Sequence, residues 1–171
     1  MNIKLTVIGK TEEKHLIEAV ETYTKRLKHY INFEILYLPD IKGVKNLSPS
    51  EIKTKEGEML IKHMEKYDKN ILFDERGKQF TSIEFSQYLQ KQMNQGIKNL
   101  NFIVGGAYGF SEAVYQRADD KISISKMTFS HQMAFSRRLK RMIFFRQTVF
   151  CLSCFCYRTL YGLLFCGHCR L

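Results

Sequence analysis

Two short stretches of the sequence combine residue types that suit the binding of a small molecule. Residues 103–109, IVGGAYG, lead an apolar run into three glycines within five positions. Glycine loses more backbone freedom on folding than any other residue, so this cluster is costly unless the backbone must pass close to something. Residues 122–133, ISISKMTFSHQM, offer backbone groups, hydroxyls and a methionine. Such groups can hold the edge of an adenine ring and cover its face, without a cradle for phosphate.

The glycine cluster differs from the usual dinucleotide-binding loop. That loop reads GxGxxG after the first strand, with an acidic residue about twenty positions later. Here the order is GGxxG after the fourth apolar stretch, and residues 121–131 contain no acidic residue. The alternative to a ligand-binding turn is a tight strand-to-helix turn in which Ser111 caps the next helix. The glycines alone leave both interpretations open.

Alternating strand-like and helix-like stretches must position these residues. The periodicity predicts strands at residues 3–8, 33–38, 70–74, 100–104 and 121–125, with a turn at 76–78. It predicts helices at residues 12–30, 48–67, 81–94 and 111–118, and the start of a last helix near 128–130. Ser48 and Thr81 each precede a glutamate by three positions, which is the pattern of a capping box.

This alternation predicts a single α/β domain whose mostly parallel sheet is covered by helices on both faces. In such sheets, ligands bind beyond the carboxyl ends of the strands. Three such ends, at residues 72–74, 105–106 and 123–128, are expected to line one crevice.

The composition favours a polyanionic partner. The chain has 171 residues, 44% hydrophobic and 26% charged, and a net charge of +10. Residues 134–171 hold seven Lys and Arg and no acidic residue, which leaves 20 basic and 17 acidic residues in 1–133. A basic excess of this kind favours nucleic acid, although a solvated lysine-rich surface is the alternative. Neither a signal peptide nor a membrane span is evident, so we expect a cytoplasmic protein.

Taken together, the motifs resemble those of a known enzyme family. VGGAYG (104–109) and ISISKMTFSHQM (122–133) are similar to the motifs of the bacterial large-subunit (23S) ribosomal RNA pseudouridine N3-methyltransferases. These enzymes belong to the SPOUT superfamily, whose members use S-adenosylmethionine. MNIKLTVIGK, FEILYLPD, KEGEMLI (55–61) and ILFDERGK fit the same pattern, so that the resemblance covers residues 1–133.

The resemblance implies a SPOUT fold with a C-terminal trefoil knot, a homodimer, and S-adenosylmethionine bound in the knot. It also suggests why the turn is rich in glycine, since a Cβ there would collide with the cofactor. Carried over by position, the cofactor contacts fall on Phe73, Gly105, Ile124, Ser125, Lys126, Met127, Thr128 and Phe129. Leu72 or Asp74 takes the place of Phe73 if the register differs by one.

The implied reaction is methyl transfer to N3 of a pseudouridine in ribosomal RNA within the ribosome. Such a displacement depends on positioning and on a base that removes the N3 proton. His131 is the candidate base, with packing or phosphate contact as its alternatives. A basic run, Arg137, Arg138, Lys140 and Arg141, is the candidate RNA-backbone contact, with a charged helix face as its alternative.

The chain departs from the family pattern in residues 134–171, where the family's EQ-x-YRA segment and PYH-type end are missing. One hypothesis is a frameshift, because residues 148–152 read one base later permit the family's Leu-Tyr-Xaa-Ala-Phe. The other hypothesis takes seriously the five cysteines, all after residue 150: two CxxC pairs at 151–154 and 166–169 approach zinc-ribbon spacing. We expect no metal at the cofactor site. If this altered tail abolishes turnover, the chain is a protein that binds cofactor or RNA without catalysis.

Overall fold

The computed structural model describes residues 1–9, 14–41, 43 and 47–123. Five described strands form one sheet in the order β2-β1-β4-β3-β5, and every neighbouring pair is parallel. Their bounds are β1 Asn2–Ile8, β2 Asn32–Leu38, β3 Lys69–Gln79, β4 Asn99–Val104 and β5 Asp120–Ser123. The predicted α/β class with a parallel sheet is therefore confirmed.

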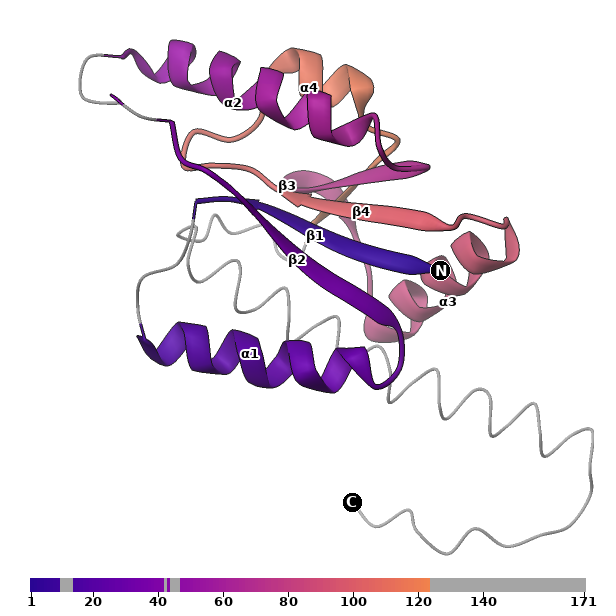
Figure 1. The fold of residues 1–171 in the computed structure, drawn as a ribbon. Coiled ribbons are helices and arrows are strands. Elements are labelled where there is room, and N and C mark those ends of the chain that lie inside the picture. Colours follow the sequence, from indigo (N-terminus) through magenta and orange to yellow (C-terminus); the bar gives the residue numbers. More distant parts are fainter. Residues whose placement is uncertain (10–13, 42, 44–46, 124–171) are drawn as a thin grey trace, which may run out of the picture.

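Helices cover both faces of this sheet, as predicted (Figure 1). The helices are α1 Lys14–Lys28, α2 Pro49–Met64, α3 Ser82–Asn94 and α4 Glu112–Arg117. α1 and α3 contribute Val20, Leu27, Phe85 and Leu89 to an apolar cluster on one face. α2 and α4 contribute Leu60, Met64 and Val114 to a second cluster on the other face. Two cores thus hold the sheet from both sides and fix the ends of its strands.

Two helix starts follow the capping chemistry that the sequence predicts. The Ser48 hydroxyl accepts a hydrogen bond from the Glu51 amide, and the Glu51 carboxylate accepts one from the Ser48 amide at 2.7 Å. Thr81 and Glu84 make the same reciprocal pair. Ser111 is the N-cap of α4 as predicted, but its side chain makes no capping hydrogen bond. Both α2 and α3 therefore begin at positions fixed by local chemistry.

β3 departs most from its predicted bounds. The sequence predicts an end at Asp74 and a turn at residues 76–78, whereas the strand continues to Gln79. Its pairing with β5 is interrupted, because Ile122 is the register partner of both Phe73 and Lys78. A Cβ on Gly77 would lie 2.6 Å from the backbone of Ile122. Close backbone packing on β5 therefore holds residues that local sequence alone assigns to a turn.

A buried chain of polar side chains crosses the three central strands. The Thr6 hydroxyl donates to Asn101 Oδ1 at 2.8 Å, Asn101 donates to Asn70 Oδ1 at 3.1 Å, and Asn70 donates to the Met64 carbonyl at 3.0 Å. Because these three side chains are all buried, their hydrogen bonds offset the cost of removing them from water. The chain also links the end of α2 to the sheet.

Candidate active site

The first paired segment of β3 ends at Phe73, beside the carboxyl ends of β4 and β5. Phe73 is the register partner of Val104 on β4 and of Ile122 on β5. Gly105 and Ser123 follow these partners directly in the chain. Residues 72–74, 105–106 and 123 therefore lie at the same end of the sheet, and the crevice that they are expected to line stays a prediction. Two predicted cofactor contacts, Phe73 and Gly105, meet at this edge.

The side chain of Phe73 belongs to the core. Only 5% of the residue is exposed, and its ring stacks on Phe102 with 5.3 Å between ring centroids. A ring that is this deeply buried has little surface left for a ligand. What Phe73 can offer at the strand end is therefore its backbone.

The structure supplies its own reason for the glycine at position 105. A Cβ added there would lie 3.0 to 3.3 Å from the ring of Phe110. Phe110 is 3% exposed, and its ring packs edge-on against Tyr115. A side chain at position 105 would therefore require the buried Phe110 ring to shift by a few tenths of an ångström.

Gly106 has a different neighbour, the carboxylate of Glu56 on α2. A Cβ on Gly106 would lie 2.6 Å from Glu56 Oε1 and 2.8 Å from Cδ. The turn then closes with a hydrogen bond of 3.2 Å from the Gly109 amide to the Gly106 carbonyl, and Gly109 has φ +77°. Glycine adopts that conformation without strain, so the cluster marks two close approaches and one left-handed position.

Glu56 is a site residue that sequence analysis did not single out. It is 8% exposed, and its Oε2 has no hydrogen-bond partner among the described residues. Burial, and secondly the negative charge of Asp40, raise the pKa of this carboxyl. A signal was present, because Glu56 falls four positions after Ile52 and four before Leu60, both buried on α2.

A second carboxylate, Asp74, ties the exit of β3 to α4. Tyr115 donates its hydroxyl hydrogen to Asp74 Oδ2, and the Arg76 amide donates to Asp74 Oδ1 at 2.8 Å. Burial and the bond to Asp74 raise the pKa of the Tyr115 hydroxyl, so it stays a donor at neutral pH. Lys121 Nζ lies 5.2 Å from the centre of the Tyr115 ring. The elements that border the site are thereby held together.

Most of the other predicted site residues lie outside the described residues. These are the cofactor positions Ile124, Ser125, Lys126, Met127, Thr128 and Phe129, the candidate base His131, and the basic run Arg137, Arg138, Lys140 and Arg141. The predicted knot, the last helix and the five cysteines fall there too. Within the described part of the chain, no group of three or more His, Cys, Asp or Glu could hold a metal ion.

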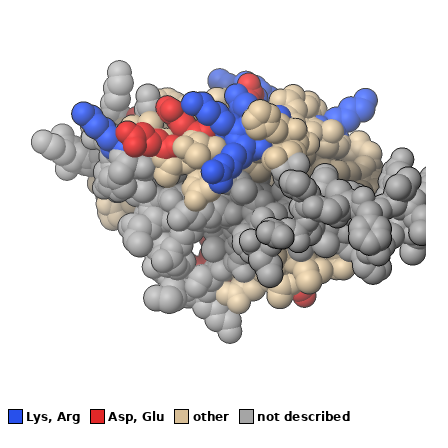
Figure 2. All heavy atoms as spheres, turned by 90° about the horizontal axis from the view of Figure 1, so that it is seen from below, with Lys and Arg blue, Asp and Glu red and all other residues tan. Residues whose placement is uncertain are grey.

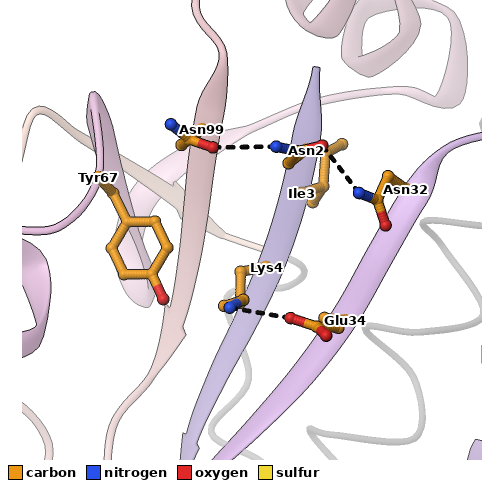
Figure 3. A pocket seen from close by; sticks show the side chains of 7 residues that line it. All are labelled: Asn2, Ile3, Lys4, Asn32, Glu34, Tyr67 and Asn99. Atoms are coloured by element: carbon orange, nitrogen blue, oxygen red, sulfur yellow. Dashed lines mark hydrogen bonds and ion pairs between the residues drawn. The ribbon is translucent and has the colours of Figure 1, made fainter.

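The opposite edge of the sheet carries a small polar pocket of about 150 Å³ (Figure 3). Asn2 donates to Asn99 at 3.1 Å and accepts from Asn32 at 2.9 Å, while Lys4 and Glu34 form an ion pair at 2.9 Å. Polar groups that bind one another leave little for a ligand. This pocket lies at the amino ends of β1, β2 and β4, away from the predicted site.

Surface charge on the described residues is mixed in sign. Figure 2 shows Lys and Arg side chains beside Asp and Glu side chains on the face that is seen from below in Figure 1. Of the described helices, none is long and apolar enough to cross a membrane. The strong basic excess that the sequence places in residues 134–171 lies outside this part.

The parallel sheet and the glycine turn at the carboxyl ends of its strands define an α/β protein, a class in which ligands bind beyond those strand ends. The family model described as "Predicted SPOUT methyltransferase" matches residues 1–139. This chain belongs to the SPOUT methyltransferase family, as its motifs predict, and members of that family use S-adenosylmethionine in general.

Similar proteins cover most of this chain. The "Ribosomal RNA large subunit methyltransferase H" of Christiangramia forsetii is 55% identical over 133 residues, which are 78% of this chain and 85% of that protein. The protein of the same name from Parabacteroides distasonis is 54% identical over 147 residues, 86% of this chain and 90% of that protein. The one from Flavobacterium johnsoniae is 55% identical over 133 residues.

Proposed function

We propose that this chain transfers a methyl group from S-adenosylmethionine to N3 of a pseudouridine in large-subunit ribosomal RNA. Its membership of the SPOUT methyltransferase family and the names of its relatives support the reaction class and the RNA. The single structural observation that carries the proposal is the register of Phe73 with Val104 and Ile122. This register brings the end of the first β3 segment beside the carboxyl ends of β4 and β5.

The described edge fits the cofactor. Backbone at Phe73 and Gly105 can bind the edge of an adenine ring, as the sequence motif suggests. S-adenosylmethionine carries a positive sulfonium, and the buried Glu56 carboxylate beside Gly106 is an anionic neighbour suited to such a cation. When bound, this cofactor supplies a methyl group on a positively charged sulfur, which makes the methyl carbon electrophilic.

The protein must position the base and accept a proton. N3 of the pseudouridine loses its proton to a base, for which we propose His131. The nitrogen then forms a bond to the methyl carbon as the carbon–sulfur bond breaks, and S-adenosylhomocysteine is left. Because this is an in-line displacement, alignment supplies most of the acceleration, and removal of the base costs about 10²- to 10⁴-fold in rate.

The remaining functional residues are proposed with the same reaction. Ile124, Ser125, Lys126, Met127, Thr128 and Phe129 complete the cofactor site. The basic run Arg137, Arg138, Lys140 and Arg141 binds the RNA backbone. The enzyme works as a homodimer on the ribosome in the cytoplasm.

The test is transfer of labelled methyl to ribosomes that lack this modification, with the modified nucleoside identified by mass spectrometry. We expect label in large-subunit RNA at a pseudouridine. His131→Ala should lower the rate and leave cofactor affinity unchanged, and His29→Ala, at an exposed position on the described surface, is the matched control. Cofactor binding without label transfer would instead indicate that this chain binds the cofactor but does not catalyse methyl transfer.

A further inference from the structure

Glu56 stands out as a buried ionisable group with no assigned role. It lies on the buried stripe of α2, between Ile52 and Leu60. The residue is 8% exposed, and its Oε2 is buried without a hydrogen-bond partner among the described residues. Burying a carboxylate without a partner costs stability, and most proteins avoid it.

Two close approaches place α2 and this carboxylate beside the turn after β4. Gly106 leaves room for it, because a Cβ there would lie 2.6 Å from Glu56 Oε1. The next residue of α2, Gly57, packs against α4, where a Cβ would lie 3.0 Å from Ser111 Cβ. The carboxylate is therefore held behind the turn that begins at Gly105, the predicted cofactor contact.

The described surroundings of Glu56 supply negative charge and no compensating cation. The negative charge of Asp40 raises the pKa of Glu56, and Asp40 packs against Gly9, where a Cβ would lie 2.6 Å from Asp40 Oδ1. The described residues contain one ion pair, between Lys4 and Glu34 at the opposite edge of the sheet. A carboxylate that is buried beside another carboxylate gains most from a cation that comes from outside.

We infer that Glu56 is a specificity-determining residue of the cofactor site, whose charge behind Gly106 favours the positively charged methyl donor over the neutral product. This inference rests on the proposed function. Before transfer, the sulfur of S-adenosylmethionine is a cation that the carboxylate attracts. After the methyl group leaves, the sulfur of S-adenosylhomocysteine is neutral and the attraction ends. The same residue therefore aids both capture of the donor and release of the product.

The inference predicts a change in the ratio of two affinities. Calorimetric titration of the full chain with S-adenosylmethionine and with S-adenosylhomocysteine gives the dissociation constants. Glu56→Gln should weaken binding of the donor by about tenfold, the size expected for loss of one unit charge at medium range in a partly buried site. Binding of the product should change by less than about twofold, since no sulfonium is present.

Two further variants separate the effect of charge from the effect of shape. Glu56→Asp keeps the charge and should keep the preference for the donor. Glu58→Gln removes an exposed charge from the same helix and should change neither affinity. In methyl transfer, Glu56→Gln should raise KM for the cofactor without lowering kcat, because the attraction weakens as the sulfur loses its charge.

The outcomes distinguish this inference from the proposed function. If Glu56→Gln weakens donor and product equally, or neither, the inference is wrong while the proposed function stands. If the unaltered chain binds neither compound, the proposed function fails and the inference fails with it. If Glu56→Gln failed to fold, it would also lose its affinity for S-adenosylhomocysteine, which should otherwise stay nearly unchanged.

Discussion

Tyr115 donates a hydrogen bond to Asp74, which joins α4 to the point where β3 leaves its first pairing with β5. The same carboxylate also accepts a hydrogen bond from the Arg76 amide, which shapes the backbone of residues 74–77. This hydrogen bond thus connects two elements that border the candidate active site. The pair is 41 positions apart in sequence, and only the fold brings it together.

The first prediction concerns this hydrogen bond. Tyr115→Phe should lower the free energy of unfolding by about 1–2 kcal/mol, because a partly buried carboxylate loses its donor. It should also weaken cofactor binding, since α4 and the end of β3 border the site. Urea unfolding measures the first effect and calorimetry the second. Tyr108→Phe, on a side chain that is 49% exposed, is the control, and an equal effect there would contradict this reading.

The second prediction uses the collision between Gly106 and Glu56. Gly106→Ala places a Cβ against the Glu56 carboxylate, so that either this buried side chain or the turn must shift, and cofactor binding should weaken. With S-adenosylhomocysteine as the ligand, whose binding should not depend on the Glu56 charge, adding Glu56→Ala removes the collision and should recover part of the affinity. In Gly105→Ala the new Cβ lies against the Phe110 ring instead. Adding Glu56→Ala to that variant should therefore recover none of its lost affinity. If the changes in affinity are additive in both double variants, the collision between Gly106 and Glu56 does not affect binding, which would contradict this prediction.

The third prediction is a pH dependence of stability. Burial, and then Asp40, raise the pKa of Glu56 above its ordinary value of 4.5 in the folded state. The folded protein therefore holds this proton at a pH where the unfolded chain has lost it, and stability falls as pH rises through that window. Glutamine does not titrate. Glu56→Gln should consequently gain stability relative to the unaltered protein between about pH 4 and about pH 7.

Denaturant unfolding at both pH values measures this difference, with Glu58→Gln as the control. A difference that stays constant or shrinks with rising pH would contradict a raised pKa at Glu56. A gain in stability combined with weaker donor binding would mark Glu56 as a residue kept for function.

The fourth prediction concerns the buried polar chain. Asn101→Ala leaves the Thr6 hydroxyl and the Asn70 amide oxygen without their partner. Unfolding free energy should fall by about 2–4 kcal/mol, because two buried polar groups lose a hydrogen bond and a cavity forms. Asn94→Ala, exposed near the end of α3, should cost less than about 1 kcal/mol. Thermal unfolding of both variants tests the contrast.

Local chemistry made much of the fold predictable from the sequence. Ser48 with Glu51 and Thr81 with Glu84 mark helix starts by contacts three residues apart, and the structure confirms both. The end of β3 was not predictable in this way. Gly77 and Lys78 pair with or pack on β5, which lies more than forty positions later in the chain.

The candidate site was predictable in place but not in all its contacts. Alternating strands and helices indicate that Phe73 and Gly105 share an edge of the sheet, and the structure shows this register. The neighbours of the glycines, Phe110 and Glu56, come from tertiary packing that no local pattern specifies. For Glu56, the four-residue spacing to Ile52 and Leu60 could have indicated a buried carboxylate.

The central claim is that the cofactor binds at the carboxyl edge of the sheet, and amide NMR spectra of the labelled full chain test it most directly. Titration with S-adenosylmethionine should shift the amide signals of Phe73, Gly105 and Gly106. The signals of Asn2, Asn32 and Asn99, at the opposite edge, should stay unchanged. Shifts confined to those three asparagines, or no shifts at a saturating concentration, would contradict the account.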